Sequence, residues 1–210
     1  GRYDELLGEL QASGQNEVSL TDSDSRKMKG AHGHLIGYNV QVAVDAQHDL
    51  IVTEEVVPAA NDRGQLSALA VAAKAELKVE RLQVVADKGY HEADQLEACE
   101  PAGLETFVPA PGGSSGRSPD GQDIFPKERF AYDAARDTYA GPGGQSLKRG
   151  SESQSRGKER IVYYHRAAGA ACALRAACTS GAYRVIARRT NEAVVERAAA
   201  RVAAHPEKVA

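Results

Sequence analysis

The chain has 210 residues, enough for one sizeable domain or two small ones. Its 26 Lys and Arg stand against 29 Asp and Glu, a net charge of −3 that excludes a strongly basic nucleic-acid-binding domain and leaves DNA contact to local patches. The sequence shows no apolar run that could span a membrane, no signal peptide and only three cysteines, so we expect a protein of the reducing cytoplasm.

The first half of the chain alternates between strand and helix patterns. Residues 2–12 place leucines on one helical face, and residues 14–35 are polar and predict a loop. Val40, Val42 and Val44 fall on one face of a strand. The pattern then predicts, in order, strands at 38–45 and 50–57 joined as a hairpin, a helix at 64–79, a strand at 81–86, a helix at 92–100 and a strand at 104–108.

The second half has a weaker pattern. Residues 109–116 predict a linker, and residues 142–160, rich in Gly, Ser, Lys and Arg, predict a mobile segment. Short strands are expected at 161–164 and 182–186, and a helix at 190–204. This region therefore predicts a small, irregular, β-rich insertion followed by a C-terminal helix.

The heptapeptide VVADKGY, residues 84–90, is the strongest candidate for a functional site. The apolar run that begins at Leu82 predicts a buried strand, and Asp87 follows directly on it. A carboxylate at the carboxyl end of a strand lies where α/β folds bind ligands, and its oxygens suit a hard cation such as Mg²⁺. A simple Asp-x-Gly turn explains the same spacing, so the motif needs its context.

Four motifs supply that context. They are TDSDSRKM at residues 21–28, GYNVQVAVD at 37–45, NDRGQL at 61–66 and ADKGY at 86–90. In this order and spacing the chain resembles the DDE transposases of bacterial insertion sequences. The resemblance covers nearly the whole chain, and it rests on the four motifs together rather than on any single one.

The resemblance implies an α/β fold with an RNase H-like mixed sheet and flanking helices. In that fold a first, central strand separates the strands at 38–45 and 81–86, and it carries the first catalytic Asp; no segment of residues 1–37 matches it, so we expect it upstream of residue 1. The implied division of the chain is 1–37, a helix and loop; 38–109, a partial catalytic core; 110–189, an insertion; and 190–210, a helix leading to a Glu motif.

The implied reaction cuts and joins DNA at transposon ends and target with two divalent metal ions. Asp87 matches the second catalytic acid and is the expected Mg²⁺ ligand. The third acid, a Glu in a Val-Glu-His-x-Phe-Gly motif, has no match in Glu192, Glu196 or Glu207, so that role is not assigned to them. The implied protein is a homo-oligomer, cytoplasmic and associated with the nucleoid, that binds no membrane.

Two further aspartates have simpler explanations. Asp45 follows the strand at 38–45 and is expected to be a turn residue, with a metal-ligand role as the alternative. Asp62 precedes the helix at 64–79 and is expected to cap it.

The cysteines indicate an incomplete metal site. Relatives of the resembled family carry Cys-Pro-x-Gly after a Tyr and later Cys-x₂-Cys-x₅-Cys, which together look like a zinc ribbon. Here Tyr139 is followed by Ala-Gly-Pro-Gly-Gly, and Gly169 stands where the second motif begins, so only Cys172 and Cys178 remain. Structural zinc normally needs four ligands, so we expect two small, buried side chains rather than a filled site.

Three functions are therefore open. The first is a fragment of a DDE transposase that is inactive by itself, because one confident carboxylate cannot hold two metals. The second is a degenerate remnant that binds DNA or another transposase subunit. The third is a metal-dependent nuclease that uses Asp87 with Asp45.

Overall fold

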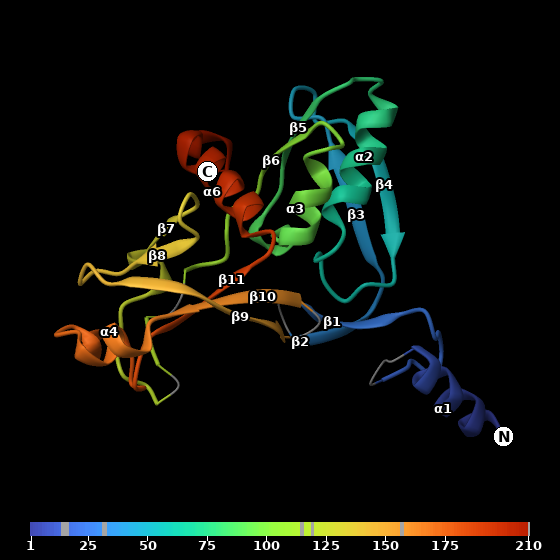
Figure 1. Cartoon of the computed structure of the whole chain (residues 1–210). Coiled ribbons are helices and arrows are strands. Elements are labelled where there is room, and N and C mark those ends of the chain that lie inside the picture. The colour runs from blue at the N-terminus through green and yellow to red at the C-terminus, as the bar shows by residue number, and fades with distance from the viewer. Residues whose placement is uncertain (14–16, 31–32, 114–115, 119, 156–157, 210) are drawn as a thin grey trace. The chain divides into compact units, whose positions relative to one another are not determined.

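The computed structural model describes residues 1–13, 17–30, 33–113, 116–118, 120–155 and 158–209 (Figure 1). It is a mixed α/β structure with several separate sheets. The chain divides into two compact units, one made of Gly1–Pro109 and Ala198–Ala210 and the other of Ala110–Arg197. We call them unit 1 and unit 2 and describe each by itself. No helix in the described ranges is long and apolar enough to cross a membrane.

Unit 1 contains most of the predicted strand and helix pattern. After α1 (Arg2–Ser13) come the strands β1 (Arg26–Gly30), β2 (Gly33–Gly37), β3 (Asn39–Val44) and β4 (Ile51–Val57). They are followed by α2 (Leu66–Glu76), β5 (Leu82–Val85), the 3₁₀ turn η1 (Lys88–Tyr90), α3 (Ala93–Cys99) and β6 (Leu104–Phe107). The predicted hairpin, two helices and two further strands are all present, with ends that differ by at most three residues.

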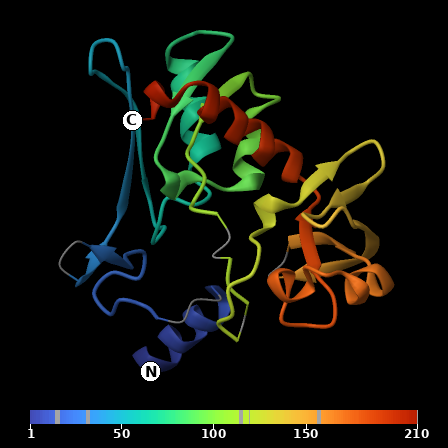
Figure 2. The ribbon, with the colours of Figure 1, turned by 90° about the vertical axis from the view of Figure 1, so that its left-hand side faces the viewer.

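The strands of unit 1 form three separate pairs. β1 pairs with β2 and β3 with β4, both antiparallel, whereas β5 and β6 are parallel and are connected through α3. β3 and β5 each have one hydrogen-bonded neighbour and do not pair with each other. Figure 2 shows the long β3–β4 hairpin at the left of unit 1.

The β1–β2 hairpin corrects the sequence prediction, because residues 14–35 were expected to be a loop. Met28 pairs with Leu35 across it, and Arg26 pairs with Gly37. The segment is polar because both faces are largely exposed, so it lacks the apolar alternation that marks a half-buried strand. Residues 14–16 and 31–32 of the predicted loop lie outside the described residues.

The core of unit 1 lies between α2, α3 and the β5–β6 pair. Leu66 of α2 and Leu96 of α3 are buried, and each contributes about 2 kcal/mol of hydrophobic stabilisation. The C-terminal part of α6 (Glu192–Ala204) covers β6, because Arg201 donates hydrogen bonds of 3.2 and 3.0 Å to the carbonyl and hydroxyl oxygens of Thr106. In the 3₁₀ turn η3 (Pro206–Lys208) that follows, the Lys208 ammonium lies 4.2 Å from the Phe107 ring centroid.

Two predicted strands of unit 1 have exposed valines. Val40, Val42 and Val44 do share one face of β3, but that face is 41–58% exposed, and the buried side chain of the strand is Gln41 on the opposite face. β5 was expected to be buried, yet Val85 is 53% exposed. The polar face of β3 is buried because its side chains have hydrogen-bond partners, described below.

Unit 2 is built on one antiparallel sheet. Its strands are β7 (Ala131–Asp133), β8 (Thr138–Ala140), β9 (Ser146–Ser155), β10 (Lys158–Tyr164) and β11 (Val185–Arg189), in the spatial order β11-β10-β9-β8-β7. The 3₁₀ turn η2 (Lys127–Arg129) precedes the sheet, and α4 (Arg166–Ala171) and α5 (Arg175–Cys178) lie between β10 and β11. Among the side chains that the structure describes, its core consists of Phe130, Tyr139, Leu147, Tyr163, Cys178 and Ile186.

The expectation of a mobile segment at residues 142–160 is wrong for the part of that segment that the structure describes. β9 and β10 occupy most of it, and only residues 156–157 lie outside the description. β9 can be polar because backbone hydrogen bonds to β8 on one side and to β10 on the other hold it in the sheet. Its buried apolar side chain is Leu147, so hydrophobic periodicity carries almost no signal there.

Candidate metal and catalytic site

Asp87 lies where the sequence predicted, directly after β5. Its backbone is extended, and its Oδ1 accepts a 2.5 Å hydrogen bond from the amide of Gly89, which closes the turn η1. The Asp87 side chain is exposed. The carboxylate is therefore held by a local turn and is open to a ligand from solvent.

Asp62 does not cap α2, which corrects the sequence prediction. The N-cap residue of α2 is Gln65, and it makes no side-chain capping hydrogen bond. Instead, Oδ1 of Asp62 accepts hydrogen bonds of 2.9 Å from the side-chain amides of both Asn39 and Gln41 on β3. The carboxylate binds these distant donors rather than the helix N-terminus, because two hydrogen bonds from side-chain amides stabilise it more than a single capping hydrogen bond would.

Gln41 connects this carboxylate to the turn that follows Asp87. Its side chain is 1% exposed and uses both ends: Nε2 donates to Asp62, and Oε1 accepts a 2.6 Å hydrogen bond from the Tyr90 hydroxyl. A buried amide with both ends satisfied fixes the groups on either side of it. Three motifs that are far apart in the sequence thus meet through one side chain.

Gly89 lies between the two carboxylates. A Cβ added to Gly89 would lie 2.8 Å from Oδ1 of Asp87 and 3.3 Å from Oδ2 of Asp62, which bounds the separation of those oxygens at about 6 Å. Burial raises the pKa of Tyr90, and the negative charges of Asp62 and Asp87 raise it further. The two acids therefore form one electrostatic environment around the Tyr90 phenol.

The donor chemistry of this pair fits a single hard cation. Both candidate ligands are carboxylates, the ligands that Mg²⁺ prefers, and Oδ2 of Asp62 and Oδ2 of Asp87 have no hydrogen-bond partner among the described residues. Within the described ranges, however, no group of three or more His, Cys, Asp or Glu side chains could hold a metal ion. The pair alone is smaller than the ligand set that two metal ions need.

Asp45 is a turn residue, and its contacts are local. Its carboxylate accepts from the amide of Gln47 and contacts Nδ1 of His48 at 2.6 Å, and these interactions lower its pKa, the His48 hydrogen bond most. It follows β3 four residues after Gln41, about 13 Å further along the strand at the usual rise per residue. The structure therefore does not bring Asp45 to the Asp62–Asp87 pair.

The three glutamates considered for the third acid all have other partners. Glu192 contacts Lys127 at 2.6 Å, Glu196 pairs with Arg188, and Glu207 contacts His205 at 3.2 Å. The first two contacts are ion pairs and the third is a local contact two residues apart in the chain, so none of them supports a catalytic role.

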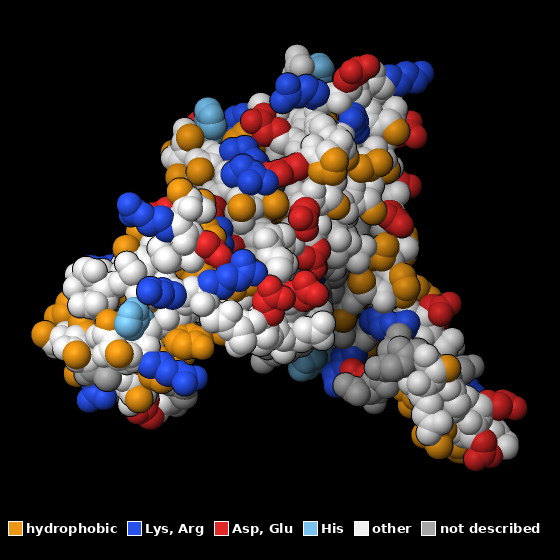
Figure 3. Space-filling model, in the orientation of Figure 1, with side chains coloured by type: hydrophobic (Ala, Val, Ile, Leu, Met, Phe, Trp, Pro, Cys, Tyr) orange, Lys and Arg blue, Asp and Glu red, His pale blue; other side chains and the backbone are white. Residues whose placement is uncertain are grey.

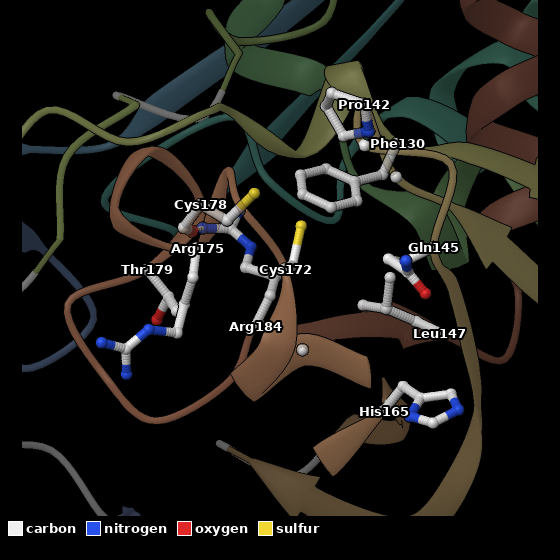
Figure 4. A pocket seen from close by; sticks show the side chains of 13 residues that line it. Phe130, Pro142, Gln145, Leu147, His165, Cys172, Arg175, Cys178, Thr179 and Arg184 are labelled. Atoms are coloured by element: carbon white, nitrogen blue, oxygen red, sulfur yellow. Dashed lines mark hydrogen bonds between the residues drawn. The ribbon is translucent and has the colours of Figure 1, made fainter. Parts of the chain in front are cut away.

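The cysteine positions of unit 2 meet at one small cavity. Pro142 matches the proline of the Cys-Pro-x-Gly pattern, which places Gly141 at its cysteine position. Gly141, Gly169, Cys172 and Cys178 all line a cavity of about 40 Å³, together with the Phe130 ring. In Figure 4 the two sulfur atoms and that ring face the same space.

This cavity does not fit a four-ligand zinc site. Two of the four positions are glycines, and Nδ1 of the nearby His165 already accepts a 3.0 Å hydrogen bond from the Ala168 amide. Burial raises the pKa of Cys178, and the neighbouring Cys172 adds to this effect, which disfavours the metal-binding thiolate. Cys178 is buried as expected, whereas Cys172 is half-buried.

Sequence reasoning missed Asn39, Gln41 and Asp62 as members of a site. The signal was present, because GYNVQVAVD and NDRGQL contain these polar residues, and Asn39 and Gln41 lie on the face of their strand opposite to the valines. Comparison of the chain with protein-family models, with curated proteins and with solved structures finds no match.

Proposed function

We propose that the chain is part of the catalytic region of an insertion-sequence DDE transposase with an RNase H-like fold. One observation carries the proposal: Gln41, Asp62, Asp87 and Tyr90, which come from three of the four motifs, form one connected site. A structural role alone does not require two carboxylates to approach each other within about 6 Å. Like charges so close are unfavourable unless a ligand or a functional need compensates.

The order of elements supports the same proposal. An antiparallel hairpin, a helix, a strand, a second helix and a parallel strand follow each other from β3 to β6. In an RNase H-like sheet a further strand lies between the counterparts of β3 and β5, and each of these two strands has one edge that pairs with no other strand among the residues described for unit 1. The proposed partners are DNA and further copies of the transposase.

In this proposal Asp87 and Asp62 hold a Mg²⁺ ion, which when bound would polarise the phosphodiester that is cut. Gln41 and Asn39 orient Asp62, and Gly89 leaves room for both carboxylates to face the same ligand. Tyr90 stays protonated at neutral pH, since its pKa is raised. Its hydroxyl donates a hydrogen bond to Gln41 and so holds the Gln41 side chain in place.

The test is a titration with Mn²⁺, in which binding is measured as the loss of the free-ion signal in electron paramagnetic resonance. We expect one weak site with a Kd on the order of 10⁻⁴–10⁻³ M. Asp87→Asn and Asp62→Asn should each weaken it at least tenfold. Asp45→Asn removes the same charge elsewhere on β3–β4 and should leave the Kd unchanged; a Kd that does not respond to Asp87→Asn would refute the proposal.

Because the described residues bring together two carboxylates rather than three or more, we expect the chain by itself not to cleave supercoiled plasmid in Mg²⁺ or Mn²⁺. Cleavage by clean protein that Asp87→Asn and Asp45→Asn both abolish would favour the nuclease instead.

A second candidate is a remnant that binds DNA without catalysis. The excess of Lys and Arg over Asp and Glu in unit 2 favours it. In that case Mn²⁺ binding at Asp62 and Asp87 is absent while DNA binding is retained.

A further inference from the structure

The two units differ sharply in charge. Residues 110–197 contain 15 Lys and Arg against 9 Asp and Glu, an excess of six positive charges, whereas the remaining residues contain 11 against 20. The overall charge of −3 hides this division. A charge asymmetry between parts of one chain indicates that the basic part meets a polyanion.

The sheet of unit 2 has one apolar face and one basic face. Leu147, Tyr139, Tyr163 and Ile186 belong to the core and lie on the first face, since strand pairing places Tyr163 opposite Ile186 and Leu147 opposite Tyr139. Alternate residues point to the other face. There Lys148 lies opposite Tyr164, and Arg160 lies opposite Arg189.

The cations of this second face have no carboxylate partner. Among the described residues, Lys148, Arg160 and Arg189 form no ion pair, and the buried Nε of Arg160 has no acceptor at all. On the core face, by contrast, Arg149 is paired with Asp137 and Glu152, and Arg188 with Glu196. Neutralised cations thus lie on one face and unneutralised ones on the other.

Two tyrosines accompany these cations. The Tyr164 and Tyr183 rings lie 5.6 Å apart, and the Arg166 guanidinium lies 5.4 Å from the first ring centroid and 5.8 Å from the second. Arg166 is exposed and forms no ion pair within the described ranges. Figure 3 shows several Lys and Arg side chains, scattered among hydrophobic ones, over the part of the molecule where α4 and β9 lie in Figure 1.

We propose that this surface of unit 2 binds DNA. The basic face consists of Lys148, Arg160, Tyr164, Arg166, Tyr183 and Arg189. Its cations would contact phosphates, and the two tyrosines with Arg166 would stack against exposed bases. Arg160 and Tyr164 are four residues apart on β10, about 13 Å, so the face spans more than one phosphate of a strand.

The inference rests on the proposed function for the choice of DNA among polyanions, and it names the surface that the DNA would occupy. Unit 1 by itself carries an excess of negative charge, which repels a polyanion, so DNA binding is expected on unit 2. The basic face shares no residue with the Asp62–Asp87 pair, so the two proposals can fail independently.

The experiment measures fluorescence anisotropy of labelled 30-nucleotide single-stranded and 30-base-pair duplex DNA with the whole chain at several salt concentrations. We expect a Kd on the order of 10⁻⁶–10⁻⁴ M at low salt and a strong decrease of affinity with salt. The double variant Lys148→Gln/Arg166→Gln should weaken binding at least tenfold and reduce the slope of log K against log salt by about 1.5. Tyr164→Leu should weaken single-strand binding more than duplex binding.

Two variants serve as matched controls. Arg129→Gln removes an exposed charge of unit 2 that is not on the basic face, and Arg81→Gln removes one from unit 1. Neither should change affinity more than twofold. The inference is overturned if DNA does not bind at low salt, if the control variants lose as much affinity as the double variant, or if polyglutamate or RNA binds more tightly than DNA.

A separate result identifies which proposal fails. DNA binding that survives Asp87→Asn but is lost in Lys148→Gln/Arg166→Gln supports the basic face, whatever the Mn²⁺ experiment shows.

Discussion

The Tyr90 hydroxyl donates a 2.6 Å hydrogen bond to the side-chain oxygen of Gln41, a residue 49 positions earlier in the chain. This contact joins the turn after β5 to the buried face of β3. Because the other end of Gln41 holds Asp62, a change at this one amide reaches both carboxylates of the candidate site.

Gln41→Leu should reduce the free energy of unfolding by about 1–3 kcal/mol, because it leaves the Tyr90 hydroxyl without its acceptor and removes one donor from Asp62. Urea denaturation followed by circular dichroism measures the change. Gln47→Leu alters an exposed turn residue in the same hairpin and should stay within about 0.5 kcal/mol of the wild type. Equal effects of the two substitutions would contradict the bridging role.

Tyr90 should make stability depend on alkaline pH. Its pKa is raised in the folded state above the usual value of about 10, so folding favours the neutral phenol. This contribution is fully present below pH 10 and is lost as the pH rises through the folded-state pKa. The wild type should therefore lose more stability between pH 9 and 11 than Tyr90→Phe does, and parallel pH profiles of the two proteins would refute the assignment.

Gly89→Ala should disturb the carboxylate pair without straining the backbone, since Gly89 has no positive φ. The new methyl group would collide with Oδ1 of Asp87 at 2.8 Å and crowd Oδ2 of Asp62 at 3.3 Å. We expect Mn²⁺ affinity to decrease at least fivefold. Gly112→Ala is the matched control, because an added Cβ there meets nothing within 4 Å, and it should have no effect.

Zinc content tests the cavity of unit 2. Purified protein should contain well under one equivalent of zinc, and a chelator should not change its thermal stability, because metal-linked folding needs a complete ligand set. One equivalent of zinc that survives dialysis would show that other side chains complete the site. Cys99→Ser is a control and should leave the zinc content unchanged. Cys99 lies in unit 1, and burial raises its pKa to about 11, which disfavours a metal-binding thiolate.

The elements of unit 1 were predictable where one buried face makes the hydrophobic residues recur at helical or strand spacing. α2 has buried residues at Leu66, Ala70 and Ala73, and the β3–β4 hairpin alternates, so both are visible in the sequence. β9 was missed because backbone pairing to two neighbours orders it while its side chains stay polar. Local patterns contain no information about such pairing.

The candidate site was predicted only in part for a similar reason. Asp87 follows its own strand and is held by its own turn, so local sequence locates it. Asp62 precedes a helix and therefore predicts a cap, but its partners Asn39 and Gln41 are more than 20 residues away. A local rule cannot anticipate a donor that the fold brings from another element.

The buried polar face of β3 determines how this strand aligns with its neighbours. A shift of one residue would turn Val40 and Val42 towards the interior and expose Gln41. Hydrophobic transfer alone favours that slipped arrangement, by about 1.5 kcal/mol for each valine. Hydrogen bonds to Asp62 and Tyr90 favour the native alignment, so the polar residues of GYNVQVAVD set the strand register of the hairpin. A variant that lacks these bonds would have two competing strand alignments instead of one.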